Sequence, residues 1–263
     1  MERIHSTAIV DPAAEIAEDV IIGPFSIVGP NVILKSGTIL ESRVVIDGHT
    51  EIGHNCKIAV GAVVGTPPQD LSYKNEPTKV IIGDNTVLRE YVTVNRASGE
   101  GNSTIVGSDC MIMAYTHIAH NCVIGNKVIM ANYAGLAGHV EVGDSAFIGG
   151  ITAIHQFVKI GKYAIISGFS GTRQDIPPFS MTDGRPAIVR GVNKVGLRRN
   201  GFTREEIDNL RKAFRIIWFE KHNLTNALEL IQTEVNIDEH IKHLIDFIQN
   251  SKRGVIIKQD QDL

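Results

Sequence analysis

Residues 106–136 read VGSDCMIMAYTHIAHNCVIGNKVIMANYAGL, and an aliphatic residue stands at every sixth position of this stretch. A spacing of six matches neither the 3.6-residue period of an amphipathic helix nor the two-residue alternation of a half-buried strand. It is typical of a parallel β-helix, in which each hexapeptide forms one short side of a coil. The stretch therefore predicts a coil whose aliphatic side chains stack inside.

The same spacing extends over most of the first two-thirds of the chain. Three sides make one coil of about 18 residues, and a single coil cannot bury its own apolar face, so many coils must stack. Outside the opening stretch, the aliphatic positions are Ile4, Val10, Ile16, Ile22, Val28, Leu34, Leu40, Ile46, Ile52, Ile58, Val64, Ile82, Leu88, Val94, Val142, Ile148, Ile154, Ile160 and Ile166.

Small residues surround the periodic positions. Glycine often follows the aliphatic residue, as at Gly107 and Gly125, and this predicts tight corners with positive φ there. The three cysteines (Cys56, Cys110 and Cys122) stand two residues before an aliphatic position, where small side chains recur. That placement indicates packing rather than disulfides or metal binding.

The register breaks at residues 66–79 and 96–104. Asp70, Glu76 and Glu100 stand where core residues are due. Because polar side chains cannot replace a core stack, both segments are expected to loop outwards. Loops on a rigid scaffold commonly carry binding residues, so the breaks are candidate functional segments.

The hexapeptide pattern fades after Ile166. Thr203 and Glu206 resemble a capping box, and apolar residues then recur at helical spacing. We expect about three helices over residues 195–250 and a frayed tail at 252–263.

Composition limits the function classes. The chain has 263 residues and a formal net charge of −3, which argues against bulk nucleic-acid binding. No apolar run approaches a membrane span, and no signal peptide precedes the repeat. A cytoplasmic protein without an integral membrane segment is expected.

Four histidines cluster in the later coils: His117, His120, His139 and His155. With about 18 residues per coil, residue 138 lies one turn above 120, and 156 lies two turns above. Three histidines could hold a divalent metal with an open position, as in a lyase or hydrolase. Alternatively, one histidine could be the general base of an acyl transfer, with glycine-corner N–H groups stabilising the oxyanion. A non-catalytic scaffold is a third possibility.

Several motifs together resemble the UDP-N-acetylglucosamine O-acyltransferase family of lipid A biosynthesis. The resemblance covers nearly the whole chain, both loops included, whereas a generic hexapeptide protein shares only the repeat. The motifs are Thr116-His-Ile-Ala-His-Asn-Cys, Leu136-Ala-Gly-His-Val, Ala153-Ile-His-Gln-Phe, Gln69-Asp-Leu-Ser-Tyr, Glu76-Pro-Thr, Arg89-Glu, Gln174-Asp-Ile-Pro-Pro and Gly196-Leu-Arg-Arg-Asn-Gly-Phe.

This resemblance implies a homotrimer that needs no cofactor or metal and moves a 3-hydroxyacyl chain from acyl carrier protein to the 3-position of a UDP-linked glucosamine. His120 matches the catalytic base, and the Gly138 N–H matches the oxyanion donor. The implied substrate-binding residues are Gln69, Asp70, His117, His139, Gln156 and, beside them, His155, with Asn193 and Arg199 at the nucleotide end. Ile165 and Gly168 match the end of the acyl-chain pocket.

Four positions depart from the family pattern. Asn121 replaces an aspartate, Ser72 a lysine, Asn95 a histidine and Asn200 an arginine. These departures leave a 3-amino sugar acceptor, which would give an amide product, as an alternative to the hydroxyl acceptor. The metal-dependent alternative would resemble the γ-type carbonic anhydrases, which are lyases built on the same coil. The Gln-Asp loop and the basic helical tail do not belong to their pattern.

Basic residues gather at the start of the helical region, and they are candidates for steering an acidic carrier protein. They are Arg198, Arg199, Arg204, Arg211, Lys212 and Arg215. The expected fold is mainly β: a left-handed parallel β-helix of hexapeptide repeats over residues 1–190, with external loops near 66–79 and 96–104. A small C-terminal α-helical domain is expected over residues 191–263.

Overall fold

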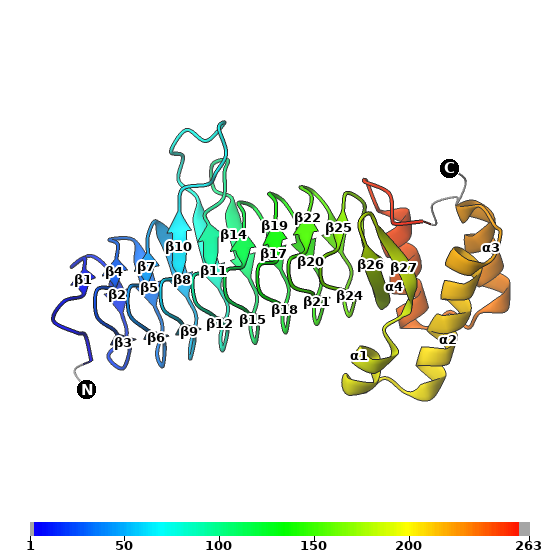
Figure 1. Cartoon of the computed structure of the whole chain (residues 1–263), viewed down its shortest axis with the longest axis horizontal. Helices are drawn as coiled ribbons and strands as arrows, with labels where there is room; N and C mark the ends of the chain where they lie inside the picture. The colour runs from blue at the N-terminus through cyan, green and yellow to red at the C-terminus, as the bar shows by residue number, and fades with distance from the viewer. Residues whose placement is uncertain (1–2, 258–263) are drawn as a thin grey trace.

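The computed structural model describes residues 3–257 and shows an elongated three-sided coil with helices at one end (Figure 1). Strands on each side stack in parallel, apart from one antiparallel pair at the C-terminal end of the third side, and the described chain forms three sheets. The predicted fold class, a left-handed parallel β-helix followed by C-terminal helices, is confirmed.

Up to β25, each sheet collects every third strand, and the last two strands both join the third sheet. The first contains β1 (Ile9–Val10), β4 (Ile27–Val28), β7 (Val45–Ile46), β10 (Val63–Thr66), β13 (Thr93–Asn95), β16 (His117–Ile118), β19 (Gly135–Leu136), β22 (Ala153–Ile154) and β25 (Gly171–Thr172). The second contains β2 (Glu15–Ile16), β5 (Val32–Leu34), β8 (His49–Ile52), β11 (Lys79–Ile82), β14 (Ser103–Val106), β17 (Val123–Ile124), β20 (Glu141–Val142) and β23 (Lys159–Ile160). The third contains β3 (Ile21–Ile22), β6 (Ile39–Leu40), β9 (Lys57–Ile58), β12 (Val87–Leu88), β15 (Met111–Ile112), β18 (Ile129–Met130), β21 (Phe147–Ile148), β24 (Ile165–Ile166), β26 (Ser180–Gly184) and β27 (Ala187–Val192).

The periodic aliphatic residues form the interior of the coil. Ile118 pairs in register with Leu136, and Leu136 pairs with Ile154, so one column of side chains rises through successive coils. Ile118 is fully buried, and the other two are almost fully buried. Burying one such side chain contributes about 1.5–3 kcal/mol, and this stacking provides most of the driving force for the coil.

The glycines that follow the aliphatic residues have a different role from the one predicted. Gly107 and Gly125 do not have positive φ. A Cβ on Gly107 would lie 2.5 Å from the carbonyl oxygen of Gly125 in the next coil. The corner prediction was therefore wrong for these two glycines, which are required because adjacent coils approach closely.

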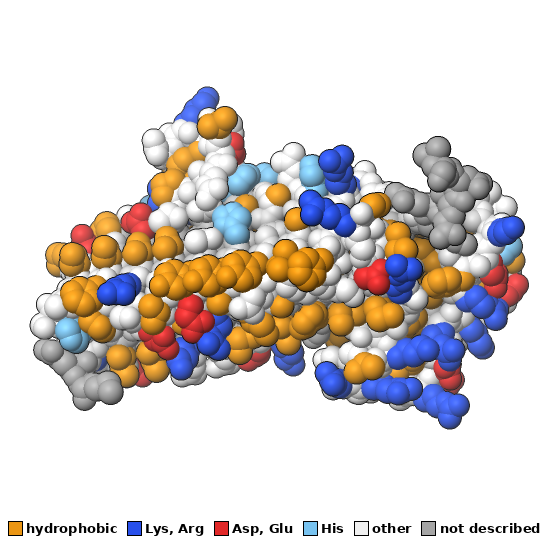
Figure 2. All heavy atoms as spheres, in the orientation of Figure 1, with side chains coloured by type: hydrophobic (Ala, Val, Ile, Leu, Met, Phe, Trp, Pro, Cys, Tyr) orange, Lys and Arg blue, Asp and Glu red, His pale blue; other side chains and the backbone are white. Residues whose placement is uncertain are grey.

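Non-glycine residues occupy many of the left-handed corners, and one column of them is exposed. Tyr91, Tyr115 and Tyr133 have φ values of 56°, 61° and 62°, and their rings stack with centroids 5.1 and 5.0 Å apart. Ile151 and Phe169 continue the column, and all five side chains are exposed. We call these five residues the exposed ridge. Figure 2 shows an apolar band along the coil.

Two longer connections leave the coil on one side. Residues 67–78 join β10 to β11, and residues 96–102 join β13 to β14. The first stands out from the coil in Figure 1. Glu76 links the two loops because its Oε1 accepts a hydrogen bond of 2.7 Å from the Gly99 N–H.

The C-terminal part packs helices over the last coils. The elements are α1 (Lys194–Arg199), α2 (Arg204–Phe214), the π-helical turn η1 (Arg215–Phe219), α3 (Leu224–Glu234) and α4 (Glu239–Gln249). The capping box is present: Thr203 Oγ1 accepts from the Glu206 N–H, and Glu206 Oε2 accepts from the Thr203 N–H. Strand β27 runs through residue 190, where the predicted domain division falls.

The predicted frayed tail was wrong for residues 252–257, and residues 258–263 lie outside the described part. Val255 and Ile256 are buried. The Trp218 indole N–H donates to the Ile256 carbonyl oxygen at 2.7 Å, and the Ile256 N–H donates to the Asp175 carbonyl oxygen at 2.9 Å. This segment is held by contacts to residues far away in sequence.

Candidate active site

His120 stands at the corner that follows β16, on the side of the coil where both loops leave it. Its ring is half-buried, and its Nδ1 lies 2.8 Å from Oδ1 of Asn121. Asn121 has φ of 59°, a left-handed conformation that asparagine adopts more readily than most residues. The corner geometry therefore turns the Asn121 side chain back towards the histidine that precedes it.

Ser98 fixes the orientation of the Asn121 amide. Asn121 Oδ1 accepts from the Ser98 N–H at 2.9 Å, and Asn121 Nδ2 donates to the Ser98 carbonyl oxygen at 3.0 Å. This pairing turns the Asn121 oxygen, which is only an acceptor, towards His120. The His120 Nδ1 must then carry the hydrogen, which leaves Nε2 free to accept a proton.

Gly138 lies directly above the His120 ring. A Cβ on Gly138 would lie 2.6 Å from both Nε2 and Cε1 of that ring. No hydrogen-bond acceptor for the Gly138 N–H is found within residues 3–257. The site therefore joins an accepting nitrogen on one coil and, on the next, a backbone donor that no described residue pairs with.

Two other histidines lie beside this pair. The centroids of the His139 and His120 rings lie 5.3 Å apart. The His139 ring also stacks on the Phe157 ring, with their centroids 4.5 Å apart. His117 Nδ1 contacts Thr93 Oγ1 at 2.8 Å. Burial, followed by the charge of His120, lowers the pKa of both His117 and His139. Neutral forms of these two histidines are therefore favoured near neutral pH.

The first loop brings a carboxylate to the same place. Asp70 Oδ1 accepts from the N–H and the hydroxyl of Ser72, at 2.9 and 2.8 Å. These bonds, with smaller contributions from Ser98 and His120, lower the pKa of the Asp70 carboxyl. Gln69 is exposed beside it. Ser72, one of the departures from the family pattern, therefore holds the Asp70 carboxylate in place.

Asn95, another departure, anchors the start of this loop. Its Nδ2 donates to Thr66 Oγ1 at 3.2 Å and to the Pro67 carbonyl oxygen at 3.1 Å. Arg96 donates to the Tyr73 hydroxyl and to the Gly65 carbonyl oxygen, each at 3.1 Å. The loop base is thus fixed by polar contacts.

The remaining predicted residues lie farther along the coil. Gln156 is exposed, two coils above His120, and His155 Nδ1 lies 3.4 Å from an Arg253 nitrogen. Ile165 is half-buried in β24, and Gly168 is exposed at the next corner. The coil therefore spreads these residues over several turns beyond His120.

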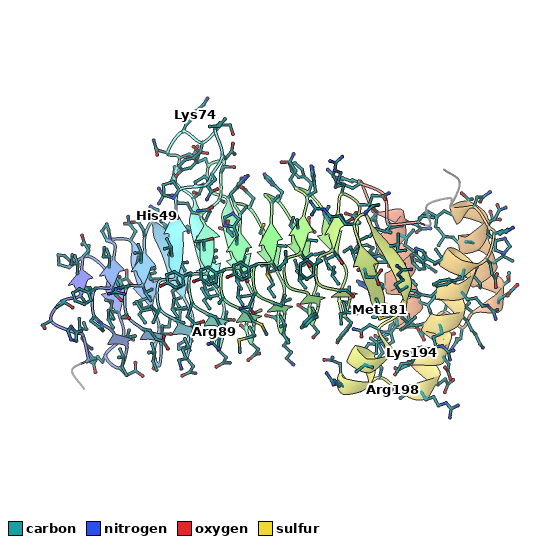
Figure 3. All side chains as sticks on the ribbon, in the orientation of Figure 1. His49, Lys74, Arg89, Met181, Lys194 and Arg198 are labelled. Atoms are coloured by element: carbon teal, nitrogen blue, oxygen red, sulfur yellow. The ribbon has the colours of Figure 1, made fainter. Side chains whose placement is uncertain are left out.

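The structure does not bring Asn193 and Arg199 to His120 within one chain. Asn193 caps α1 by accepting from the Gly196 N–H at 3.0 Å, and its Nδ2 donates to the Tyr163 carbonyl oxygen. Figure 3 shows Lys194 and Arg198 of α1 on the opposite side of the molecule from Lys74. Asn200 caps the other end of α1 through a 2.8 Å bond to the Gly196 carbonyl oxygen.

Sequence reasoning missed Ser98. It lies in the second register break, but nothing in the local pattern connects it to a corner 23 residues later.

Among residues 3–257, no group of three or more His, Cys, Asp or Glu side chains is placed to hold a metal ion. In the same range, no helix is both long enough and apolar enough to cross a membrane.

The coil and its histidine corner define the class, a hexapeptide-repeat transferase: the bacterial transferase hexapeptide profile matches residues 103–138. The profile described as Udp N-acetylglucosamine O-acyltransferase, domain 2, matches residues 175–256. With the curated relatives described next, these findings show that the chain belongs to the UDP-N-acetylglucosamine O-acyltransferase family.

Relatives match over almost their whole length. The acyl-[acyl-carrier-protein]–UDP-N-acetylglucosamine O-acyltransferase of Thermodesulfovibrio yellowstonii is 52% identical over 97% of this chain and 99% of its own. The Chlorobaculum tepidum enzyme of the same name is 56% identical over 94% of each chain. The solved UDP-N-acetylglucosamine acyltransferase from Campylobacter jejuni is 36% identical, with a TM-score of 0.91 over 97% of this chain and 100% of its own.

Proposed function

We propose that this protein transfers a 3-hydroxyacyl chain from acyl carrier protein to the 3-hydroxyl of UDP-N-acetylglucosamine, the first step of lipid A biosynthesis, in the cytoplasm. Family membership and the names of the curated relatives support the reaction type and both substrates. One observation carries the proposal for the site: His120 presents Nε2 beside the Gly138 N–H, which has no acceptor in the described part of the chain.

The proposed chemistry uses that pair directly. Nε2 of His120 takes the proton of the sugar hydroxyl as its oxygen attacks the thioester carbonyl carbon. A C–O bond forms, and the Gly138 N–H stabilises the negative charge on the carbonyl oxygen. The C–S bond then breaks, and the leaving thiolate takes the proton back from His120. The reaction is balanced without a cofactor.

The surrounding residues are proposed to position the substrates. Asp70 and Gln69 hold the sugar from the loop, and His117 and His139 contact the sugar or the acyl group. Gln156 and His155 extend this surface along the coil. Ile165 and Gly168 close the acyl-chain pocket, which is consistent with their position several coils beyond the base.

A homotrimer is part of the proposal. The exposed ridge supports it, because a continuous row of exposed apolar side chains is typical of an interaction surface. Leu71 is fully exposed on the first loop. Asn193 and Arg199 could reach the nucleotide of a site whose His120 belongs to another copy, since they lie at the start of the helical region and not beside the His120 of their own chain.

Carrier docking is proposed at the basic residues of the helical region. Arg204, Arg211 and Arg215 form surface ion pairs with Asp208 or Glu220, which reduces their contribution. Lys194, Arg198, Arg199 and Lys212 form no ion pair with a carboxylate in the described chain. Charge reversal at Lys212, together with Arg211, should raise the donor KM in a salt-sensitive manner. An unchanged KM would remove these residues from the proposal. This proposed docking surface lies within residues 191–263, which we propose form a separate helical domain.

The decisive experiment is an acyl-transfer assay with 3-hydroxyacyl carrier protein of varied chain length. UDP-N-acetylglucosamine and its 3-amino analogue are offered separately. Ester formation that is lost in His120→Ala supports the proposal. His54→Ala is the matched control, because His54 is an exposed coil histidine bound to Asp84. Absence of ester in the wild type, or full activity in His120→Ala, would refute it.

A further inference from the structure

A basic cavity lies beyond His120 on the coil, where β22 and β25 meet the hairpin of β26 and β27. Its volume is about 630 Å³. Small residues, Ala153 and Gly171, form part of its lining, together with His155, Arg173 and Arg185. Figure 2 shows Lys or Arg side chains next to histidines on this part of the coil.

Arg253 adds a third guanidinium group, which contacts two of the residues that line this cavity. Its Nε donates to the Arg173 carbonyl oxygen at 2.8 Å, and a terminal nitrogen lies 3.4 Å from His155 Nδ1. These two contacts tie the C-terminal segment to the coil and hold the guanidinium beside His155. The remaining N–H groups of Arg253 are available to a ligand.

The three arginines lack the partners that arginine usually has. Within residues 3–257, none of them forms an ion pair with a carboxylate, and the Arg173 and Arg185 side chains form no hydrogen bond. Arg190 on the same hairpin differs, because Asp183 accepts from its Nε at 2.6 Å. A group of uncompensated guanidinium groups around a cavity attracts an anion, and their planar forks match phosphate oxygens.

The cavity lies close enough to His120, the proposed base, for one substrate to reach both. Ile118 pairs with Leu136, Leu136 with Ile154, and Ile154 with Thr172, so Thr172 stands three coils above Ile118. At about 4.8 Å between neighbouring strands, three coils correspond to about 14 Å. A substrate that reacts at His120 could therefore place a phosphate in this cavity.

We propose that Arg173, Arg185 and Arg253 form a phosphate site that holds a phosphate group of one of the two substrates. The inference rests on the proposed function, because both substrates carry such a group: the acceptor has a diphosphate, and the carrier holds its acyl chain through a phosphopantetheine arm.

The test compares Arg185→Gln and Arg253→Gln with Arg190→Gln as the matched control. The KM is measured for UDP-N-acetylglucosamine, for 3-hydroxyacyl-phosphopantetheine and for 3-hydroxyacyl-pantetheine, which lacks the phosphate. We expect the KM of one of the two phosphate-bearing substrates, UDP-N-acetylglucosamine or 3-hydroxyacyl-phosphopantetheine, to rise about tenfold in both cavity variants. The kcat should change little. Arg185→Gln removes no hydrogen bond within the described chain, so misfolding does not complicate that variant.

The pattern of KM changes among the three substrates identifies which substrate supplies the phosphate. A higher KM for the UDP-sugar alone assigns the site to the diphosphate. A higher KM for the phosphorylated donor, but not for the dephosphorylated one, assigns it to the carrier arm. Unchanged KM values, or the same rise in Arg190→Gln, would overturn the proposal. Titration of the protein with UDP and with phosphopantetheine tests binding without turnover, so failure of the acyl-transfer assay and failure of this site remain distinguishable.

Discussion

Replacing Gly138 by alanine should lower kcat about 100-fold while the coil stays folded. The added Cβ would lie 2.6 Å from Nε2 and Cε1 of His120, whereas nonbonded carbon atoms normally lie about 3.5–4.0 Å apart. The His120 ring must therefore move by roughly 1 Å. A misplacement of that size can cost about 10²-fold in rate. Movement also strains the 2.8 Å contact with Asn121 that fixes the tautomer.

The assay is kcat at saturating donor and acceptor, with thermal unfolding followed in parallel. Gly138 does not have positive φ, so alanine is not strained by backbone conformation. Gly135→Ala is the matched control in the same coil, because its Cβ would meet nothing within 4 Å. If Gly138→Ala keeps kcat within about threefold of the wild type, or if Gly135→Ala loses as much, the argument from clearance fails.

Three further outcomes are expected. Asn121→Leu removes the acceptor for His120 Nδ1, so kcat should fall about 10- to 100-fold. Imidazole ¹⁵N shifts should show loss of the Nδ1–H tautomer, and an unchanged tautomer would contradict this assignment. Gly168→Met should shift activity towards shorter acyl chains, checked by profiling donor lengths, and an unaltered profile would count against the pocket. Burial raises the pKa of the Cys122 thiol to about 12, so it stays protonated below that pH and should resist iodoacetamide at pH 8 until the protein is unfolded, which mass spectrometry can detect.

The coil was predictable because its information is local and repeated. An aliphatic residue at every sixth position determines which side chain points inward, and the 18-residue coil then aligns distant positions. That is why His120 and Gly138 could be placed together before any contact was known. The roles assigned to individual site residues remain predictions, since they came from a family resemblance and not from the spacing.

Contacts that depend on irregular segments could not be predicted in this way. Ser98 reaches Asn121 from a loop whose path no period describes. The glycines were misread because the close approach of two coils is a property of neighbouring turns and not of one corner. The tail was misread because its partners, Asp175 and Trp218, lie far away along the chain.

The stacked coils also determine how this enzyme could change during evolution. An insertion of six residues between His120 and Gly138 would rotate every later side chain onto the next face and separate the two residues. Duplication of one whole coil would keep all columns aligned and lengthen the molecule by about 4.8 Å. If the duplicated coil lay between Gly138 and Gly168, the proposed acyl pocket would become longer by that step. Large changes in chain-length preference are therefore available only in whole-coil increments, and single substitutions make the finer adjustments.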